Sequence, residues 1–353
     1  MTIQLLTTGG TIASVPGMGG RNVSGALDGE SLAVAIGAEL PAWLHPITES
    51  LLQKPSNAIN GDDLQTIEAR VRELITDPAV TGVVLTHGTD TLEDTGYFLH
   101  LTLGDCAKPV VLTGSQRALH ETGSDAIRNL TDAVRVAANP ASRGQGVVVV
   151  FDQEIHSASL VRKISSYRLT GFGSPGYGPL GHIDHGEVHY SFRAMPARQI
   201  PSNRALPRVD ILYAAAGSAT LIDAAHNDGA QGLVIDSLGR GHVPPDWMTN
   251  IRAACADGLP VAITSNCLSG SVRAVYEFPG SLTTLLSAGA MPAGELSARQ
   301  ARILLMLLLS RGSRDTDLAW QFCRASARGS GGCSASPGSG SMPHKATQAG
   351  SSL

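Results

Sequence analysis

The sequence predicts an α/β protein with a mainly parallel sheet flanked by helices. Short runs of β-branched and aliphatic residues alternate with segments whose apolar positions recur at helical spacing. These runs are continuous rather than alternating in polarity, which is typical of strands buried on both faces of a parallel sheet. Hydrophobic residues make up 42% of the 353 residues, and this length predicts about two domains.

The first half of the chain contains four apolar runs that predict strands, at residues 3–6, 82–86, 109–113 and 147–151. Between the first two, Asp62 or Asp63 is suited to cap a helix, because a carboxylate accepts hydrogen bonds from the first backbone N–H groups. The apolar side chains between Leu64 and Ile75 recur at helical spacing. A second helix is expected around Leu130.

A Gly/Pro-rich stretch and a polar stretch precede a second series of alternating elements. Its expected strands lie at 209–212, 233–235 and 261–264, and its helices near 221–225, 246–256 and 297–311. We therefore expect the following units: an N-terminal catalytic domain over 1–190, a linker over 191–208, a smaller C-terminal α/β domain over 209–324 and a disordered Ser/Gly-rich tail over 325–353.

Composition and charge exclude several classes of protein. A net charge of −4 and only 4% aromatic residues argue against a nucleic-acid-binding protein. The longest apolar run falls short of the ~18 residues of a membrane span, so no membrane partner is expected. The N-terminus lacks the basic and long apolar regions of a signal peptide, which predicts a cytoplasmic location.

Cysteine spacing gives little support for a disulfide framework or a zinc site. The five cysteines are odd in number and show no C-x-x-C pair. We interpret them as free thiols, in keeping with a reducing compartment. They are Cys106, Cys255, Cys267, Cys323 and Cys333.

Polar residues gather directly after the four strands of the first series, at residues 7–11, 87–91, 113–117 and 152–154. Parallel α/β sheets bind ligands outside the carboxyl ends of their strands, so these loops can converge on one small polar ligand. For any single loop, an equally good reading is that Thr and Asp only cap the following helix.

Thr11 follows two glycines, whose missing side chains let backbone N–H groups approach a ligand or an oxyanion closely. Neither nucleotide fingerprint fits: residues 8–11 do not match G-x-G-x-x-G, and G-x-x-x-x-G-K-[ST] is absent. A G-x-S-x-G elbow is absent as well, so an ordinary serine triad is not indicated. The Thr11 hydroxyl can serve as a nucleophile if a base lies within reach.

Two motifs together carry a family resemblance. T-G-G-T-I-A at residues 8–13, with T-H-G-T-D-T at 86–91, resembles the bacterial-type L-asparaginase / glutaminase-asparaginase family. Either string alone is moderately specific, and the pair is specific. Further similarity extends to about residue 324 and includes T-G-S-Q-R at 113–117 and G-R-G-H-V-P at 239–244.

The resemblance implies a threonine amidohydrolase with two hydroxyls facing one substrate. Thr11 resembles the nucleophilic threonine and Thr89 the second threonine. Lys163 is then the cation that lowers the proton affinity of Thr89, and Asp90 the carboxylate that binds the α-ammonium of the substrate. Taken singly, Lys163 could be a solvated surface charge and Asp90 a helix cap. Within the paired motif, the functional interpretation of both residues is favoured over these structural ones.

The resemblance also implies a substrate-binding set, in which Gly88 stands with Thr89 and Asp90. Ser56 lies where the family contacts the α-carboxylate, and Asn57 stands where a glutamine is common. His242 occupies a position where an asparagine often reaches the site of the neighbouring subunit, although a plain hydrogen-bonding role is the simpler reading. Glu277 fits the spacing of the glutamate that the family supplies across the subunit interface, in a divergent segment.

One departure concerns the mobile loop after the first motif, which in the family usually carries a tyrosine that polarises the nucleophile. Residues 21–25 contain no tyrosine, so that role is vacant or moved. The resemblance implies an L-asparagine amidohydrolase without metal or organic cofactor, assembled as a homotetramer of tight dimers. Two alternatives stay open: a glutaminase-asparaginase acting on both amides, and a non-catalytic amino-acid-binding relative. A dinucleotide-dependent oxidoreductase is disfavoured by the absent glycine fingerprint.

Overall fold

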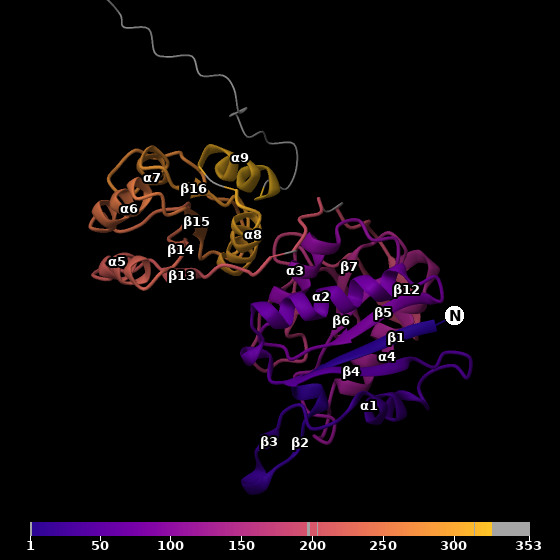
Figure 1. Ribbon diagram of the computed structural model, residues 1–353. Coiled ribbons are helices and arrows are strands. Elements are labelled where there is room, and N and C mark those ends of the chain that lie inside the picture. The colour runs from indigo at the N-terminus through magenta and orange to yellow at the C-terminus, as the bar shows by residue number, and fades with distance from the viewer. Residues whose placement is uncertain (1, 196–197, 203, 314, 327–353) are drawn as a thin grey trace, which may run out of the picture.

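The computed structural model describes residues 2–195, 198–202, 204–313 and 315–326, and its two main β-sheets are each layered with helices (Figure 1). The larger main sheet has eight strands and the smaller has four, and two further sheets have two strands each. The predicted α/β class with a mainly parallel N-terminal sheet is confirmed. The first sheet ends with β12 at Tyr190, and the second begins with β13 at Val209.

The N-terminal sheet has the strand order β12-β11-β8-β7-β6-β5-β1-β4. The strands from β7 to β4 are parallel, whereas β8, β11 and β12 form an antiparallel edge. The bounds are β1 (Thr2–Gly9), β4 (Ile47–Lys54), β5 (Val80–Thr86), β6 (Val110–Thr113), β7 (Val147–Phe151), β8 (Glu154–Ser157), β11 (Gly181–Asp184) and β12 (Glu187–Tyr190).

Four helices cover the two faces of this sheet: α1 (Gly29–Ile36), α2 (Gly61–Thr76), α3 (Leu92–Leu103) and α4 (Ala126–Ala138). The helices α1 and α4 share one apolar core with Leu5 and Val84, and α2 and α3 share another with Leu6 and Leu85. Successive side chains of β1 and β5 thus enter opposite layers, which explains their continuous apolar runs.

The start of α2 corrects one sequence-based expectation. The N-cap is Asn60, whose side chain accepts a hydrogen bond from the Asp63 backbone N–H, while the Asp63 carboxylate accepts one from the Asn60 N–H. The prediction of Asp62 or Asp63 as the cap is therefore wrong. A reciprocal capping box satisfies two helix-terminal donors at once, which a single carboxylate at the first position could not do.

The C-terminal sheet is parallel, in the order β13-β14-β15-β16. Its strands are β13 (Val209–Tyr213), β14 (Gly232–Ser237), β15 (Val261–Ser265) and β16 (Met291–Pro292). The helices are α5 (Thr220–Asn227), α6 (Trp247–Ala256), α7 (Leu282–Ser287), α8 (Ala298–Ser310) and α9 (Asp315–Ser326). Beyond Ser326, the expected tail lies outside the described residues.

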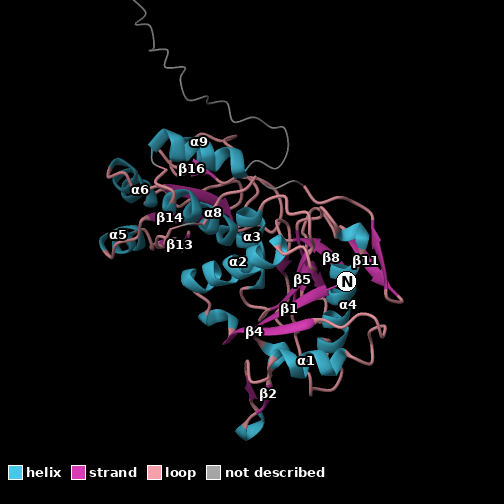
Figure 2. Ribbon diagram, turned by 45° about the vertical axis from the view of Figure 1, so that its right-hand side comes forward, coloured by secondary structure: helices cyan, strands magenta, loops and turns pink. Residues whose placement is uncertain are grey.

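The helix α8 lies between the C-terminal sheet and α3, and both ribbon views show this arrangement (Figure 1 and Figure 2). Phe98 of α3 shares a buried apolar cluster with Leu304 and Leu308 of α8. The two layered units are therefore joined by a continuous apolar core, and a residue of α8 can reach the start of α3.

Short elements complete the strand ends: η1 (Thr11–Ala13), β2 (Val15–Pro16), η2 (Met18–Gly20), β3 (Asn22–Val23), η3 (Ser56–Ala58), η4 (Pro140–Ser142), β9 (Arg162–Lys163) and β10 (Phe172–Gly173). Among the described helices, none is long and apolar enough to cross a membrane. Cys106, Cys255 and Cys267 are free thiols as expected, whereas Cys323 is disulfide-bonded, so the prediction of a free thiol is wrong there.

Candidate active site

The loops that follow β1, β4 and β5 touch at the carboxyl edge of the N-terminal sheet. A Cβ on Gly10 would lie 2.4 Å from the Cα of Gly88, and a Cβ on Gly88 would lie 2.7 Å from Ser56 Oγ. Gly10 also has φ +84°, a conformation that side chains disfavour. Glycine at both positions therefore permits the close contact between the two motif loops, which follow β1 and β5.

The next loop along the sheet joins the same group. A Cβ on Gly114, after β6, would lie 2.4 Å from the carbonyl oxygen of His87 and 3.5 Å from Cγ2 of Thr89. Strand order places β6 beside β5, so this approach follows from the parallel topology. The polar residues that follow β1, β4, β5 and β6 thus lie around one small region.

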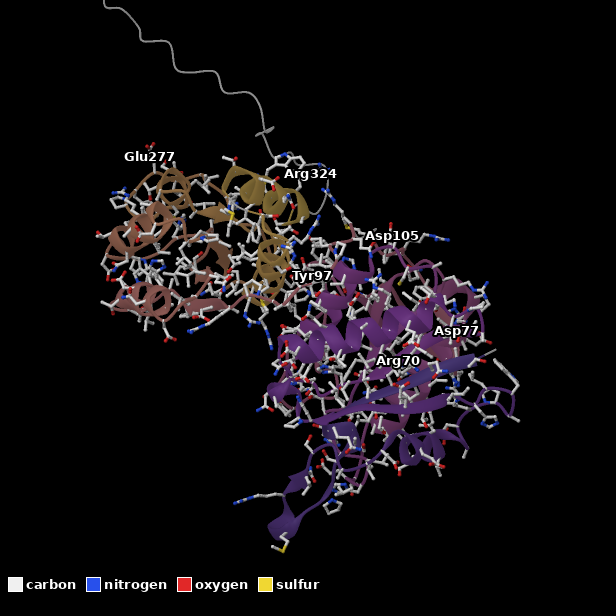
Figure 3. All side chains as sticks on the ribbon, in the orientation of Figure 1. Arg70, Asp77, Tyr97, Asp105, Glu277 and Arg324 are labelled. Carbon is white, nitrogen blue, oxygen red and sulfur yellow. The ribbon has the colours of Figure 1, made fainter. Side chains whose placement is uncertain are left out.

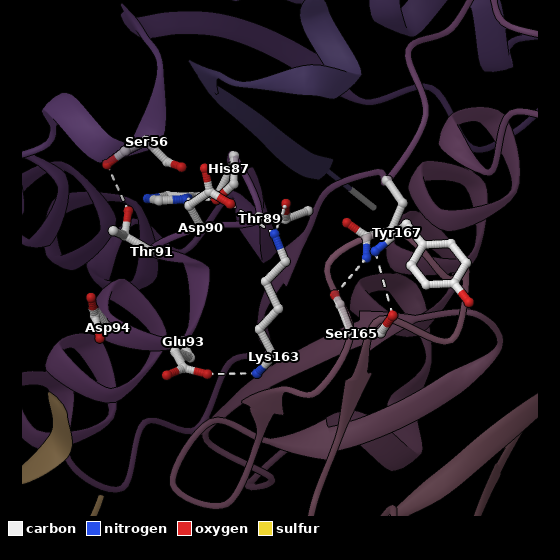
Figure 4. A network of polar contacts seen from close by, with 12 residues as sticks. Ser56, His87, Thr89, Asp90, Thr91, Glu93, Asp94, Lys163, Ser165 and Tyr167 are labelled. Atoms are coloured by element: carbon white, nitrogen blue, oxygen red, sulfur yellow. Dashed lines mark hydrogen bonds and ion pairs between the residues drawn. The ribbon is translucent and has the colours of Figure 1, made fainter. Parts of the chain in front are cut away.

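Lys163 makes the central polar contacts of this region (Figure 4). Its Nζ donates to Thr89 Oγ1 at 2.8 Å and to Asp90 Oδ1 at 2.8 Å. Thr89 is buried, whereas the Asp90 side chain is 69% exposed. The ammonium can stabilise an alkoxide on Thr89, and the exposed carboxylate can reach a ligand at the mouth of the site.

The backbone of Lys163 is held by a residue that the sequence did not single out. Its N–H donates to Glu93 Oε2 at 2.6 Å, and Glu93 lies in the first turn of α3. The strand pair β9–β10 fixes the same segment from the other side, with Lys163 opposite Phe172. The sequence carries an acidic pair, Glu93 and Asp94, shortly after the second motif, but this pair does not reveal a contact with the Lys163 backbone.

His87 is fully buried between β5 and α3 and has a structural role. Its Nδ1 lies 2.8 Å from the Gly88 carbonyl oxygen and its Nε2 lies 2.9 Å from Thr95 Oγ1. A carbonyl can only accept, so Nδ1 carries the proton and Nε2 accepts from Thr95. Burial lowers the pKa of His87 to about 4, which keeps the ring neutral.

Ser56 and Asn57, both in η3, differ in environment. Ser56 is buried beside Gly88, and its carbonyl oxygen accepts a hydrogen bond from Thr91 Oγ1 at 2.7 Å. That bond ties the loop after β4 to the second motif. Asn57 is exposed.

Thr11 begins η1 and directly follows the close approach of Gly10 to Gly88. Its side chain is half-buried, and its hydroxyl has no hydrogen-bond partner among the residues that the structure describes. The loop beyond it carries Val23, 51% exposed, and Asn22, whose Nδ2 donates to Glu121 Oε1 at 2.6 Å. The structure thus brings Thr11 to the edge of the site without a polarising partner.

His242 and Glu277 lie in the C-terminal unit. The His242 ring packs against Tyr276 and Phe278, with ring centroids 5.6 and 5.0 Å apart. Burial lowers the pKa of His242, which favours the neutral ring. Glu277 is exposed at the outer edge of this unit, far from the strand ends of the first sheet (Figure 3). Within one chain, these residues are not brought to the Lys163 cluster.

The described part of the chain contains no group of three or more His, Cys, Asp or Glu side chains arranged to hold a metal ion. The chemistry of the cluster is that of hydroxyls, one ammonium and one exposed carboxylate. A buried hydroxyl bonded to a lysine at the strand ends of an α/β sheet is typical of enzymes that act through an activated hydroxyl.

Comparisons with known proteins identify the family. The description "Asparaginase, N-terminal" matches residues 2–196, and "Glutaminase/Asparaginase C-terminal domain" matches residues 208–322. The chain belongs to this family of asparaginase hydrolases, as the motifs indicated.

Individual relatives agree. The chain is 38% identical to an L-asparaginase of Bacillus licheniformis over 310 residues, covering 87% of this chain and 95% of the relative. It is 31% identical to a glutaminase-asparaginase of Pseudomonas fluorescens biotype A over 332 residues, covering 91% and 89%. The structure of a probable cytoplasmic L-asparaginase from Campylobacter jejuni matches with a TM-score of 0.80 and 29% identity, covering 91% of this chain and 99% of that one.

Proposed function

We propose that this protein is an L-asparagine amidohydrolase that releases L-aspartate and ammonia, with Thr11 as the nucleophile. One observation supports it above the others: Lys163 Nζ bonds both the Thr89 hydroxyl and the Asp90 carboxylate. A single ammonium thus joins a group suited to proton transfer with a group suited to binding an amino acid.

The substrate is a zwitterion with a terminal amide. Its α-ammonium pairs with the exposed Asp90 carboxylate, a charge-assisted contact. Its α-carboxylate accepts hydrogen bonds from the Ser56 hydroxyl and from backbone N–H groups around Gly88, which lie side by side. The amide then extends toward Thr11 and Thr89.

The reaction follows from these roles. Thr11 Oγ attacks the amide carbon, and backbone N–H groups of the glycine loops stabilise the oxyanion that forms. The Thr11 hydroxyl proton passes through Thr89 to the departing nitrogen, which leaves as ammonia. Lys163 stabilises Thr89 while the proton is in transit. Water then cleaves the ester on Thr11, which releases aspartate and restores the hydroxyl.

A homotetramer of tight dimers is part of the proposal. Val275, Tyr276 and Phe278 are 57%, 56% and 43% exposed in one chain, and Glu277 stands among them. A cluster of exposed apolar side chains is typical of an interface. Burying it against a second subunit would carry Glu277, with His242 behind it, toward that subunit's site. Light scattering on the purified protein tests the tetramer.

We also propose a domain division and a cytoplasmic location for this protein. We assign residues 1–190 to the catalytic domain, 191–208 to the linker and 209–324 to the C-terminal domain, in line with the two sheets. Limited proteolysis in the linker tests this division. Cell fractionation tests the cytoplasmic location.

A glutaminase-asparaginase is the second candidate, favoured by the similarity to the Pseudomonas fluorescens relative. One methylene separates the two substrates, and it is worth only ~1–3 kcal/mol of discrimination. Ammonia release from L-asparagine, D-asparagine, L-glutamine and succinamate tests both candidates. Turnover of L-asparagine alone supports the L-asparagine amidohydrolase, and similar turnover of L-glutamine supports the glutaminase-asparaginase. If no amide releases ammonia, both enzyme candidates are wrong and the protein is a non-catalytic amino-acid-binding relative.

A further inference from the structure

Arg299 is a residue of the C-terminal unit that reaches the second motif of the N-terminal unit. It lies in the first turn of α8, and its Nη2 donates to the Asp90 backbone carbonyl oxygen at 2.8 Å. The same nitrogen donates to Asp94 Oδ2 at 2.8 Å, and Nη1 lies 3.4 Å from Glu93 Oε1. One guanidinium thus contacts three acceptors at the start of α3.

These contacts continue to the Lys163 cluster. The second carboxylate oxygen of Glu93 accepts the Lys163 backbone N–H, and the Asp90 side chain accepts the Lys163 ammonium. Asp90 is therefore held at two points, by Arg299 through its backbone and by Lys163 through its side chain. Arg299 is linked to the cluster without touching a reacting atom (Figure 4 shows the Glu93 and Asp94 carboxylates that it contacts).

The burial of its two carboxylate partners makes Arg299 difficult to replace. The side chains of Glu93 and Asp94 are only 8% and 19% exposed and carry like charges on adjacent residues. Asp94 Oδ1 has no hydrogen-bond partner among the described residues. Without Arg299, two carboxylates would lie close together with their main cation gone, and the first turn of α3 would shift to relieve the repulsion.

The two units are also joined by contacts that do not involve this arginine. Phe98, Leu304 and Leu308 already form a continuous apolar core between α3 and α8. Arg299 instead uses a planar, forked group to bridge acceptors in fixed directions, which a lysine could not reproduce. Its geometry suits alignment of the Asp90 backbone more than adhesion between helices.

We propose that Arg299 is a positioning residue for substrate binding: it fixes the Asp90 backbone so that the Asp90 carboxylate faces the α-ammonium. The inference rests on the proposed function, because it takes Asp90 as the ammonium-binding group. It makes substrate affinity depend on the docked position of the C-terminal unit.

The test compares three variants with the wild type in the ammonia assay, together with calorimetric binding of L-aspartate. Arg299→Gln should raise KM for asparagine and Kd for aspartate about tenfold, with a smaller loss in kcat, because a hydrogen bond to a charged group is lost at the binding end. Arg299→Lys should recover part of the affinity, since it keeps the charge and loses the fork. Arg302→Gln is the matched control: Arg302 lies one turn further along α8, and its Nε donates to the Val209 carbonyl oxygen.

The pH dependence gives a second readout. Burial raises the pKa of Asp94 to about 6, and Arg299, Arg302, Glu93 and Asp210 are the charged groups around it. As pH falls through about 6, Asp94 becomes neutral and its ion pair with Arg299 is lost, so the wild-type KM should rise below that pH. Arg299→Gln has no such pair to lose, so its KM should be raised already at neutral pH and should not rise further as pH falls, because protonation of Asp94 there relieves the repulsion with Glu93. Arg302→Gln should keep an inflection, displaced toward higher pH because Arg302 lowers the pKa of Asp94.

One result would overturn the inference: KM and Kd values of Arg299→Gln that match the wild type, whether or not its thermal midpoint changes. If the Arg299→Gln protein does not fold, Arg299→Lys is used for the same test. An unchanged KM in Arg299→Lys would then overturn the inference. Absence of ammonia release from the wild type contradicts the proposed enzyme activity instead, and aspartate binding by the variants still decides the role of Arg299.

Discussion

The two motif threonines occupy different environments. Thr89 is buried, and its hydroxyl accepts a hydrogen bond from Lys163. Thr11 is half-buried, and its hydroxyl has no partner in the described part of the chain. On the Thr89 side of the site, the hydroxyl is therefore hydrogen-bonded within one chain, whereas the Thr11 side lacks a hydrogen-bond partner for its hydroxyl among the described residues.

This difference follows from how each residue is supported. Thr89 lies between β5 and α3, where His87, Glu93 and Lys163 are held by strands and a helix. Thr11 is followed by a loop of two-residue strands and short 3-10 turns, with few buried side chains. A side chain whose partners are fixed by strands and helices is better preorganised than one without such partners. We therefore expect Thr89 to be preorganised and Thr11 to complete its environment when substrate binds.

The largest effect is expected at Thr11. Thr11→Val replaces the hydroxyl with a methyl group, removes the proposed nucleophile and leaves the shape of the side chain. Ammonia release should fall by several orders of magnitude, while circular dichroism and the thermal midpoint stay near wild type. Serine is the matched substitution, because Thr11→Ser keeps an oxygen and should retain measurable turnover. A folded Thr11→Val protein with more than about a tenth of wild-type kcat would contradict the nucleophile assignment.

The next effect tests whether Thr89 and Lys163 act together. Lys163→Met and Thr89→Val should each reduce kcat severely, because each removes one end of the 2.8 Å hydrogen bond. Residues that act as a unit have non-additive effects, so the double variant should be little worse than either single one. Single-turnover rates of the four proteins complete the cycle. If the two losses multiply, the residues act independently, and Lys163 is then only a neighbouring charge.

A smaller effect is expected from Asp90, which binds rather than reacts. Asp90→Asn removes the charge that pairs with the α-ammonium and should weaken asparagine turnover about 10- to 100-fold in kcat/KM. Succinamate has no amino group and should lose far less in the same variant. The ratio of the two substrates is the measurement. Equal losses would show that Asp90 has another role.

Long, continuously apolar strands and the motif loops that follow them could be predicted from the sequence. Both faces are buried in the strands β1, β5, β6 and β7. Burial on both faces requires apolar residues at nearly every position, and this continuous apolar pattern is visible in the sequence. β4 was missed because it is an edge strand of mixed polarity that is only half-buried. The antiparallel edge of β8, β11 and β12 was missed because those strands are short and rich in polar residues.

The candidate site divides in the same way. Gly10, Gly88, Thr89 and Lys163 lie together as the motifs led us to expect. Arg299 could not be found from sequence, because 209 residues separate it from the Asp90 carbonyl it contacts, and a backbone acceptor leaves no mark in the sequence. Glu93 has the same character, since its partner is the Lys163 backbone N–H. Contacts to the main chain depend on tertiary structure and carry no residue pattern.

The smallest expected effect concerns the loop beyond Thr11, where the comparison of the two threonines is sharpest. Asn22 Nδ2 donates to Glu121 Oε1 at 2.6 Å, an exposed contact that joins this loop to the segment after β6. If that contact helps the loop cover Thr11, Asn22→Ala should raise KM for asparagine only about two- to threefold, because exposed hydrogen bonds contribute little. Thr89 is held by other elements, so the kcat deficit of Thr89→Val should be unchanged when Asn22→Ala is added. Ser24→Ala, two residues along the same loop, serves as the control for a substitution without that bond. A loss in Asn22→Ala as large as that of Thr89→Val would show that the loop organises the reacting groups themselves, and the contrast between the two halves of the site would then be wrong.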